Sequence, residues 1–145
     1  MMGSNHAASA SASDAPCPCG RTNAKGKALS LRECCGRYLD RFETLPAPDA
    51  ESLMRSRYTA FVRADANYLK ATWHVSQRPA ELGFDPATRW LGLAVKDARR
   101  IDDEHAEVEF VARYRIGGRA VRLHERSRFV REDDGRWYYV DGEQY

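Results

Sequence analysis

Hydrophobic side chains between residues 50 and 62 recur at the spacing of one face of an α-helix. Asp49 stands directly before this stretch, where its carboxylate can cap the first turn. A stripe of this kind most often packs in a hydrophobic core. Its members are Met54, Tyr58, Phe61 and Val62. The arginines of the same stretch fall largely outside the stripe, and we expect them on the other faces: Arg55, Arg57 and Arg63.

Two shorter helices are expected on either side of this one. The first spans about Tyr38 to Phe42 and ends before the chain is broken by Pro46 and Pro48. The second starts at another capping residue, Asp65, and continues through Tyr68, Leu69 and Trp73. The next stretch, up to about residue 90, has no regular pattern.

The second half of the chain changes to a period of two, which is typical of β-strands. Apolar and polar positions alternate over residues 107–116, and Gly117-Gly118 is a hairpin signal before a long strand at 120–130. A turn at "EDDG" leads into "RWYYVDG", and "LAVKDARRID" supplies a fourth strand. Helices followed by an antiparallel sheet predict the α+β class, with the helices laid across one face of the sheet.

Composition adds little evidence about partners. The chain has 145 residues with 23 Lys+Arg, 21 Asp+Glu and a formal net charge of +2, which gives no argument for a nucleic-acid or membrane partner. The Ala/Ser-rich residues 1–15 lack the features of a secretory signal, and no stretch approaches the roughly 20 apolar residues of a membrane span. We expect a flexible leader at 1–15, a cytoplasmic protein and no membrane partner.

All four cysteines are crowded into one short segment, as a Cys-x-Cys pair and an adjacent pair with fourteen residues between them. Two chain segments folded together can supply the four thiolates that a tetrahedral zinc ion takes. We therefore predict one zinc ion and the metal ligands Cys17, Cys19, Cys34 and Cys35. Two disulfides are one alternative, which fits a reducing compartment less well. Four free thiols are the other, and such clustering by chance is unlikely. An iron–sulfur cluster is less favoured because adjacent cysteines are cramped for it.

Three glycines fit this prediction. Gly20 and Gly26 permit tight turns between the cysteine pairs, and Gly36 follows the second pair, where we expect the chain to turn away. A unit of this size has almost no core of its own, so metal binding would supply its folding free energy.

The stretches "CPCG…CCG", "LMRSRYTAFVRADANYLKATWH", "EVEFVARYR" and "RLHERSRFVREDDGRWYYVDG" strongly resemble the YchJ-like family of uncharacterised bacterial proteins, over about residues 16–142. The resemblance implies a SEC-C-like metal-binding motif at 16–40 and an NTF2-like domain at 47–145, in which helices pack on a curved sheet to form a cone-shaped pocket. It places the motif's metal ligands on the four cysteines. Here the spacer between the pairs is longer than usual and "GRT" replaces the usual "GSG".

NTF2-like pockets in other proteins hold acid–base enzymes, so the resemblance directs attention to ionisable side chains. The candidates are His74, Glu109, Tyr114, His124, Glu125 and Tyr139. Neighbours on a strand point to opposite faces, so only one of His124 and Glu125 can enter the pocket. Glu109 lies opposite the apolar face, where we expect cross-strand charge pairs with residues such as Arg126. We therefore assign no catalytic residue and no organic cofactor.

Seven arginines on the two long strands could form a positive face for RNA or an acidic protein, although nearby glutamates dilute this charge. They are Arg113, Arg115, Arg119, Arg122, Arg126, Arg128 and Arg131. A solvated, ion-paired face is the preferred interpretation. Nucleic acid is therefore a less favoured partner than protein.

We expect a zinc-binding, non-enzymatic adaptor that docks to other proteins through its cysteine motif, as the similar motif of SecA does. The docking surface would consist of Arg21, Lys25, Lys27, Leu29, Leu31 and Arg32. The alternative is a small-molecule enzyme or ligand carrier built around the cone. A pocket that encloses several ionisable groups would favour this alternative, whereas a cone filled by aromatic side chains would favour the adaptor. The resemblance also allows a homodimer.

Overall fold

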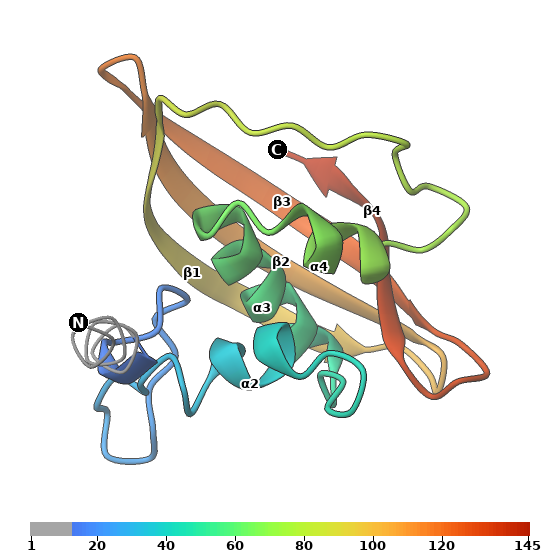
Figure 1. Cartoon of the computed structure of the whole chain (residues 1–145). Helices are drawn as coiled ribbons and strands as arrows, with labels where there is room; N and C mark the ends of the chain where they lie inside the picture. The colour runs from blue at the N-terminus through green and yellow to red at the C-terminus, as the bar shows by residue number, and fades with distance from the viewer. Residues whose placement is uncertain (1–12) are drawn as a thin grey trace, which may run out of the picture.

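The computed structural model describes residues 13–145, so most of the predicted leader lies outside the described residues (Figure 1). Four antiparallel strands form one sheet in the order β1-β2-β3-β4, each paired with its neighbour in sequence. The strands are β1 (Thr88–Arg100), β2 (His105–Ile116), β3 (Arg119–Arg131) and β4 (Trp137–Gln144). The predicted α+β meander is therefore confirmed. None of the described helices has the length and apolar character needed to span a bilayer.

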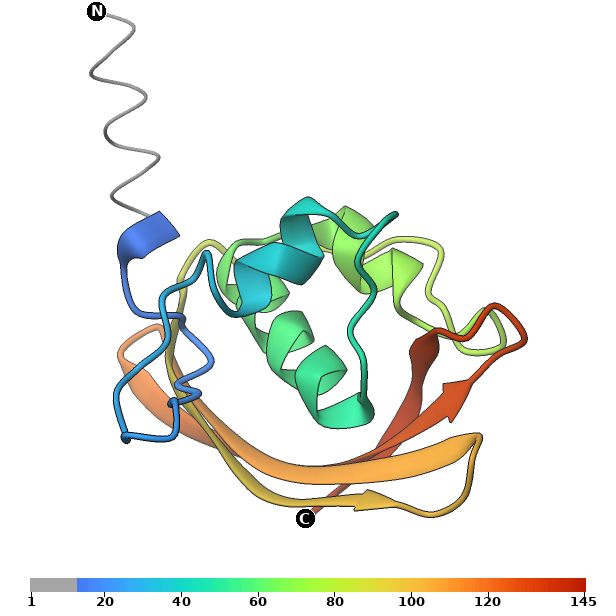
Figure 2. The same ribbon diagram turned by 90° about the horizontal axis from the view of Figure 1, so that it is seen from below.

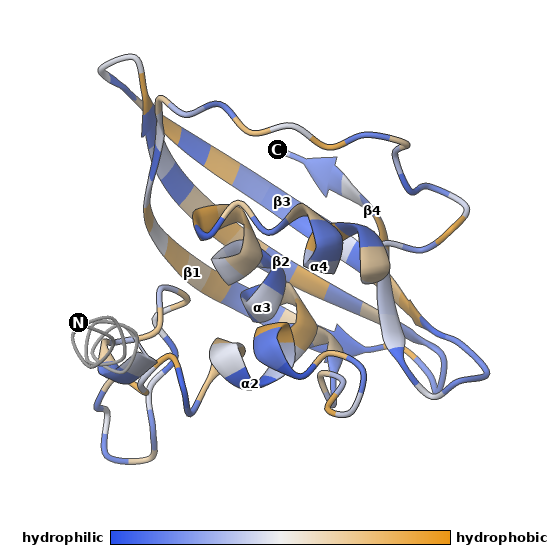
Figure 3. Ribbon diagram, viewed as in Figure 1, coloured by the Kyte–Doolittle hydropathy of each residue, from blue (hydrophilic) through white to orange (hydrophobic). Residues whose placement is uncertain are grey.

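The hairpin between β2 and β3 turns at the predicted glycine pair. Gly117 and Gly118 have φ of 56° and 82°, in the left-handed region that glycine enters without strain. Along β2 and β3 apolar and polar residues alternate, so one face is apolar and the other polar (Figure 3). The fourth predicted strand begins earlier than expected, at Thr88, because Trp90 and Leu93 pair with β2.

The long helix, α3 (Ala50–Val62), lies in the concave side of the sheet (Figure 2). Asp49 accepts a hydrogen bond from the backbone nitrogen of Ser52 at 2.7 Å, and the next helix, α4 (Ala66–Ala71), is capped in the same way by Asp65. Both predicted caps are confirmed. The helices and the concave face share one core, in which Leu53, Leu69 and Phe129 are almost completely buried.

Two helix boundaries differ from those expected. The first short helix, α2 (Cys35–Asp40), starts at the second cysteine pair and ends before Phe42. Tyr38, the expected first residue, therefore lies in the middle of the helix. Trp73 lies outside α4, which ends at Ala71. Instead, Trp73 forms an isolated bridge with Tyr139 of β4, and a tertiary contact thus ends the helix before its apolar pattern does.

The sheet owes part of its curvature to irregular pairing. Register shifts interrupt the ladder between Trp90 and Gly92, between Val95 and Asp97, and beside Phe129 in β3. Bulges of this kind bend a strand and increase its twist. The sheet therefore wraps around α3 instead of lying flat against it (Figure 2).

Candidate metal centre and ligand cavity

The four cysteines converge at the edge of the fold. Their sulfur atoms lie within 4.8 Å of one another, and the Sγ atoms of Cys19 and Cys34 are 3.6 Å apart. A zinc ion with Zn–S bonds of about 2.3 Å would place its sulfur ligands about 3.8 Å apart. No disulfide joins them, and all four side chains are buried. The donor set therefore has the number, chemistry and spacing that a tetrahedral thiophilic metal requires.

Backbone geometry around the cysteines explains this convergence. Gly20 and Gly26 have φ of 77° and 78°, which confirms the turns predicted there. Gly36 differs from the prediction: it lies inside α2, not at a turn. Its Cα packs against the backbone of Leu31, and a Cβ at this position would lie 2.6 Å from the Leu31 carbonyl oxygen. Glycine is needed at residue 36 because the chain between the cysteine pairs passes so close to it.

The cysteine segment is joined to α3 by side chains from both. The Sγ of Cys17 lies 3.7 Å from the Thr59 hydroxyl, and Arg55 donates to the Cys19 carbonyl oxygen at 3.1 Å. Arg21 donates to the Ser52 hydroxyl at 2.9 Å. The cysteines also belong to the same core cluster as Leu53. A metal ion at this site would therefore fix the segment on the main helix, beside β1 (Figure 2).

The thiols influence one another's ionisation strongly. The pKa of Cys17 is lowered, first by its hydrogen bond with Cys19 and then by those with Cys34 and Cys35. The pKa of Cys35 is raised, first by its hydrogen bond with Cys17. One thiolate is thus favoured at the expense of the next, as expected when like charges share a buried site. A cation among the sulfurs would allow all four to ionise.

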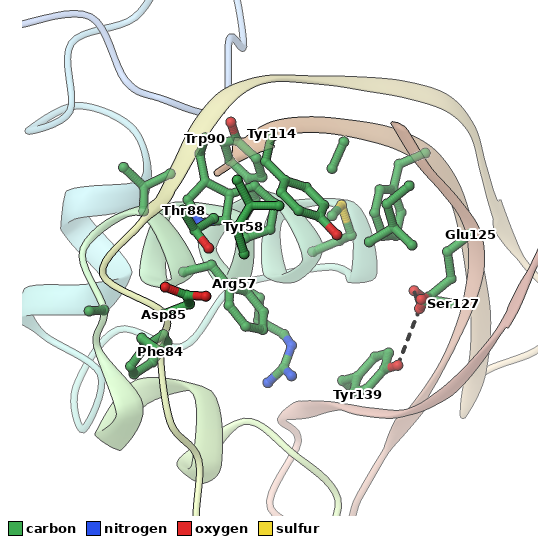
Figure 4. Close-up of a pocket in the computed structure, with 18 of the residues that line it drawn as sticks. Arg57, Tyr58, Phe84, Asp85, Thr88, Trp90, Tyr114, Glu125, Ser127 and Tyr139 are labelled. Atoms are coloured by element: carbon green, nitrogen blue, oxygen red, sulfur yellow. Dashed lines mark hydrogen bonds between the residues drawn. The ribbon is translucent and has the colours of Figure 1, made fainter. Parts of the chain in front are cut away.

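A cavity of about 540 Å³ opens between α3, the loop before β1 and the concave face of the sheet. Pockets of about 300–1,000 Å³ are the size that holds small organic ligands. At one end Trp90 packs against Tyr58, Phe61 and Tyr114, with ring centroids 5.1 to 5.7 Å apart. Figure 4 shows Trp90 and Tyr114 at this end, with Arg57, Glu125 and Tyr139 farther along the cavity. The aromatic side chains therefore line the cone without filling it.

The most unusual residue in the cavity is Arg57 of α3, which is only 6% exposed. Burial lowers the pKa of its guanidinium to about 10, so the group remains charged at neutral pH. The expectation that Arg57 lies outside the apolar stripe of this helix was wrong. A better signal was present, because Arg57 is three residues after Met54 and four before Phe61 and hence shares their helical face.

A carboxylate lies across the cavity from this helix. Glu125 of β3 accepts hydrogen bonds at Oε2 from the Ser127 hydroxyl at 2.6 Å and from the Tyr139 phenol at 3.2 Å (Figure 4). Burial is the first cause that raises the pKa of Tyr139, and the charge of Glu125 adds to it, so the phenol stays protonated and donates. Gly142 of β4 leaves the space that the Glu125 carboxylate occupies.

The predicted ionisable candidates are divided between two faces of the sheet. Tyr114, Glu125 and Tyr139 line the cavity. Glu109 and His124 lie on the outer face, where their side chains are 2.7 Å apart, and His74 contacts Glu132 at 2.8 Å outside the cavity. Of the neighbouring residues His124 and Glu125, Glu125 is thus the one that enters the pocket. No histidine of the described chain lines the cavity.

Of the seven arginines on the two long strands, two form ion pairs within residues 13–145, so the expected ion-paired face is formed only in part. Arg126 lies between Asp97, Glu107 and Glu109 at 2.8 to 3.1 Å, and Arg128 is 2.6 Å from Asp141. These pairs neutralise Arg126 and Arg128, and no acidic side chain of the described residues pairs with the other five: Arg113, Arg115, Arg119, Arg122 and Arg131.

The fold and the site together define a class: an NTF2-like cone with a cavity, preceded by a four-cysteine motif of the SEC-C type. Residues 49–142 match the family described as "YchJ, middle NTF2-like domain". A UPF0225 protein of Polaromonas sp. strain JS666 is 66% identical over 89% of this chain and 93% of its own length. One from Polaromonas naphthalenivorans is 60% identical over 90% and 98%. The chain belongs to this YchJ-like, UPF0225 family.

Two solved structures share this fold over most of the chain. The solution structure of RPA3114, a SEC-C motif containing protein from Rhodopseudomonas palustris, is 33% identical with a TM-score of 0.74, covering 90% of this chain and 98% of that one. The crystal structure of a SEC-C motif containing protein from Psychrobacter arcticus is 31% identical with a TM-score of 0.75, covering 90% and 82%. The predicted family and fold are therefore confirmed.

Proposed function

We propose that the protein is a zinc-stabilised binding protein whose cone holds a small molecule. The four cysteines would bind one zinc ion. A complete set of four thiolates leaves no open coordination position, so this zinc would be structural. Its role would be to hold the segment of Cys17 and Cys19, together with α2, on α3.

The zinc site is tested by native mass spectrometry of protein purified without a metal-affinity column or chelator. We expect a mass excess of one zinc per chain that disappears on denaturation. Replacing Cys34 and Cys35 by Ser should abolish it, whereas replacing the exposed Thr22 by Ala should leave it intact. Unchanged metal content in the double variant, or a wild-type mass lower by four hydrogens, would refute the zinc site.

The observation that carries the ligand-binding proposal is the cavity of about 540 Å³ with a buried arginine in its wall. An empty space of this size beside a buried charge lowers stability, because apolar walls lose packing and the charge lacks full compensation. Sites that tolerate such features commonly do so for function. The Glu125 carboxylate is already held by two hydroxyl donors at one oxygen, which favours recognition over proton abstraction.

Tryptophan side chains provide a direct test of ligand binding. Trp73 and Trp90 line the cavity, whereas Trp137 lies outside it. In ¹⁵N-labelled protein, addition of 2-naphthamide as a neutral aromatic probe should shift the indole N–H signals of Trp73 and Trp90. The Trp137 signal is the internal control and should not move. If all three signals stay fixed at millimolar probe, or all move together, the cavity does not bind ligands specifically.

Docking to a protein through the cysteine motif is the second candidate. Of the residues expected in that surface, Arg21 is tied to α3, and Leu29 and Leu31 pack against the core. Lys25 and Lys27 lie on the exposed loop between the cysteine pairs and fit an acidic partner. In lysine-specific crosslinking in cells, both should crosslink to one protein that exposed Lys96 on the sheet does not reach. Equal crosslinking from Lys96 would count against this surface.

A further inference from the structure

Arg57 has hydrogen-bond donors that the protein does not use. An arginine has five N–H donors, and here Nη1 donates to the Leu69 carbonyl oxygen at 2.8 Å and to the Thr72 hydroxyl at 2.7 Å. Within residues 13–145, Nε and Nη2 have no hydrogen-bond partner, and no carboxylate forms an ion pair with the group. Neither nitrogen is fully enclosed by protein atoms, so an acceptor bound in the cavity could pair with this charge, and such pairing would be favoured at a largely buried arginine.

A second unsatisfied donor lies beside the first. Nε1 of Trp73 is fully buried without a hydrogen-bond partner, and Trp73 also lines the cavity. The guanidinium carbon of Arg57 lies 4.9 Å from the centre of the Trp73 ring and 4.6 Å from that of Tyr139. Two neighbouring donors therefore lack an acceptor at the same wall of the cavity.

The free edge of Arg57 specifies the chemistry of the missing group. Nε and Nη2 form a planar fork that matches the two oxygens of a carboxylate. The rest of the wall is largely apolar, with Phe61, Phe84 and Trp90 among its members. We propose that the ligand is a small carboxylate with an apolar, aromatic body, held at its carboxylate by Arg57. This inference rests on the proposed ligand-binding function.

The charges of the cavity favour a monoanion over a phosphate ester. Arg57 is the one basic side chain among the described residues that line the cavity, whereas Glu125 and Asp85 line it too. A dianionic phosphate would carry one negative charge without a partner and would meet repulsion from these carboxylates. A carboxylate is neutralised by Arg57 alone.

Four matched probes test the ligand class, each titrated against the full chain with the Trp73 and Trp90 indole signals as the readout. 2-Naphthoate should bind about tenfold or more tightly than the isosteric 2-naphthamide, because its hydrogen bonds to Arg57 are charge-assisted. 2-Naphthyl phosphate and 2-naphthylmethylammonium should both bind more weakly than the naphthoate.

Variants connect the preference to the residues. Arg57→Lys keeps the charge but loses the fork and should remove most of the preference for naphthoate, whereas Arg63→Lys, on the surface after the same helix, should retain it. Glu125→Gln removes a repelling charge and should strengthen naphthoate binding several-fold relative to naphthamide binding. If Arg57→Lys does not fold, the comparison of naphthoate with naphthamide in Glu125→Gln tests the carboxylate preference instead.

Each failure has a separate meaning. Equal affinity for naphthoate and naphthamide, or tighter binding of the ammonium or phosphate probe, overturns the carboxylate inference but leaves the binding function standing. If no probe moves Trp73 and Trp90, the proposed function fails as well. A preference for naphthoate that survives in Arg57→Lys would show that another group holds the carboxylate.

Discussion

Replacing Gly36 by alanine tests how the cysteine segment is packed. The added Cβ would lie 2.6 Å from the Leu31 carbonyl oxygen, which is closer than Cβ atoms approach other atoms in real structures, and 3.2 Å from the carbonyl carbon, which is also tight. The carbonyl cannot rotate away freely, because it accepts hydrogen bonds from the backbone nitrogens of Gly36 at 2.8 Å and Cys34 at 3.1 Å. The Leu31 backbone must therefore move, and the second cysteine pair with it.

The expected cost is the difference of two terms. Overpacking of a rigid site costs about 1–3 kcal/mol, and the fixed backbone places this case in the upper part of that range. Alanine regains about 1 kcal/mol through its better helix propensity. The net loss of about 1–2 kcal/mol corresponds to a melting temperature lower by about 3–8 °C for a domain of this size.

Thermal unfolding monitored by circular dichroism, with zinc bound, measures this loss. Zinc competition with a chromophoric chelator should also show weaker binding in the Gly36→Ala protein, by up to about tenfold, because the Cys34 and Cys35 sulfurs are displaced. Gly83→Ala is the control, since a Cβ there meets nothing within 4 Å. A Gly36→Ala protein with wild-type melting temperature and zinc affinity would refute the close approach.

Three further predictions test other parts of the molecule. Asp49→Ala removes the α3 cap and should lower the free energy of unfolding by about 1 kcal/mol in urea, whereas Asp49→Asn should retain most of it. In Gly142→Ala the new methyl group would collide with the Glu125 carboxylate and break its hydrogen bonds with Ser127 and Tyr139. We expect the free energy of unfolding to fall by about 1–3 kcal/mol and the Trp73 indole signal to shift. An unmoved Trp73 signal would contradict this. Hydrogen bonds from His124 and then from Arg126 lower the pKa of Glu109. The ionised Glu109 therefore stabilises the folded state fully above the ordinary glutamate pKa, and this contribution is lost as the pH falls below it. Glu109→Gln should flatten the decrease of unfolding free energy at acid pH, and an identical decrease in the variant would exclude this role.

Local sequence determined much of the architecture. The caps Asp49 and Asp65, the Gly117-Gly118 turn and the alternation along β2 and β3 act over a few residues, so they could be predicted before any long-range contact was known. The cysteine cluster was predictable for a different reason. Four thiols in one short segment have few roles in a chain without other cysteines.

The cavity was decided by tertiary structure alone. Arg57, Glu125 and Tyr139 come from α3, β3 and β4, and no sequence spacing relates them. Whether a space survives between helix and sheet depends on strand curvature, which the register shifts of the β1–β2 and β3–β4 pairings help to set. Burial of Arg57 likewise depends on what covers its face of α3. Periodicity identifies the faces of an element, but only the packing of distant elements determines which of them become walls of a site.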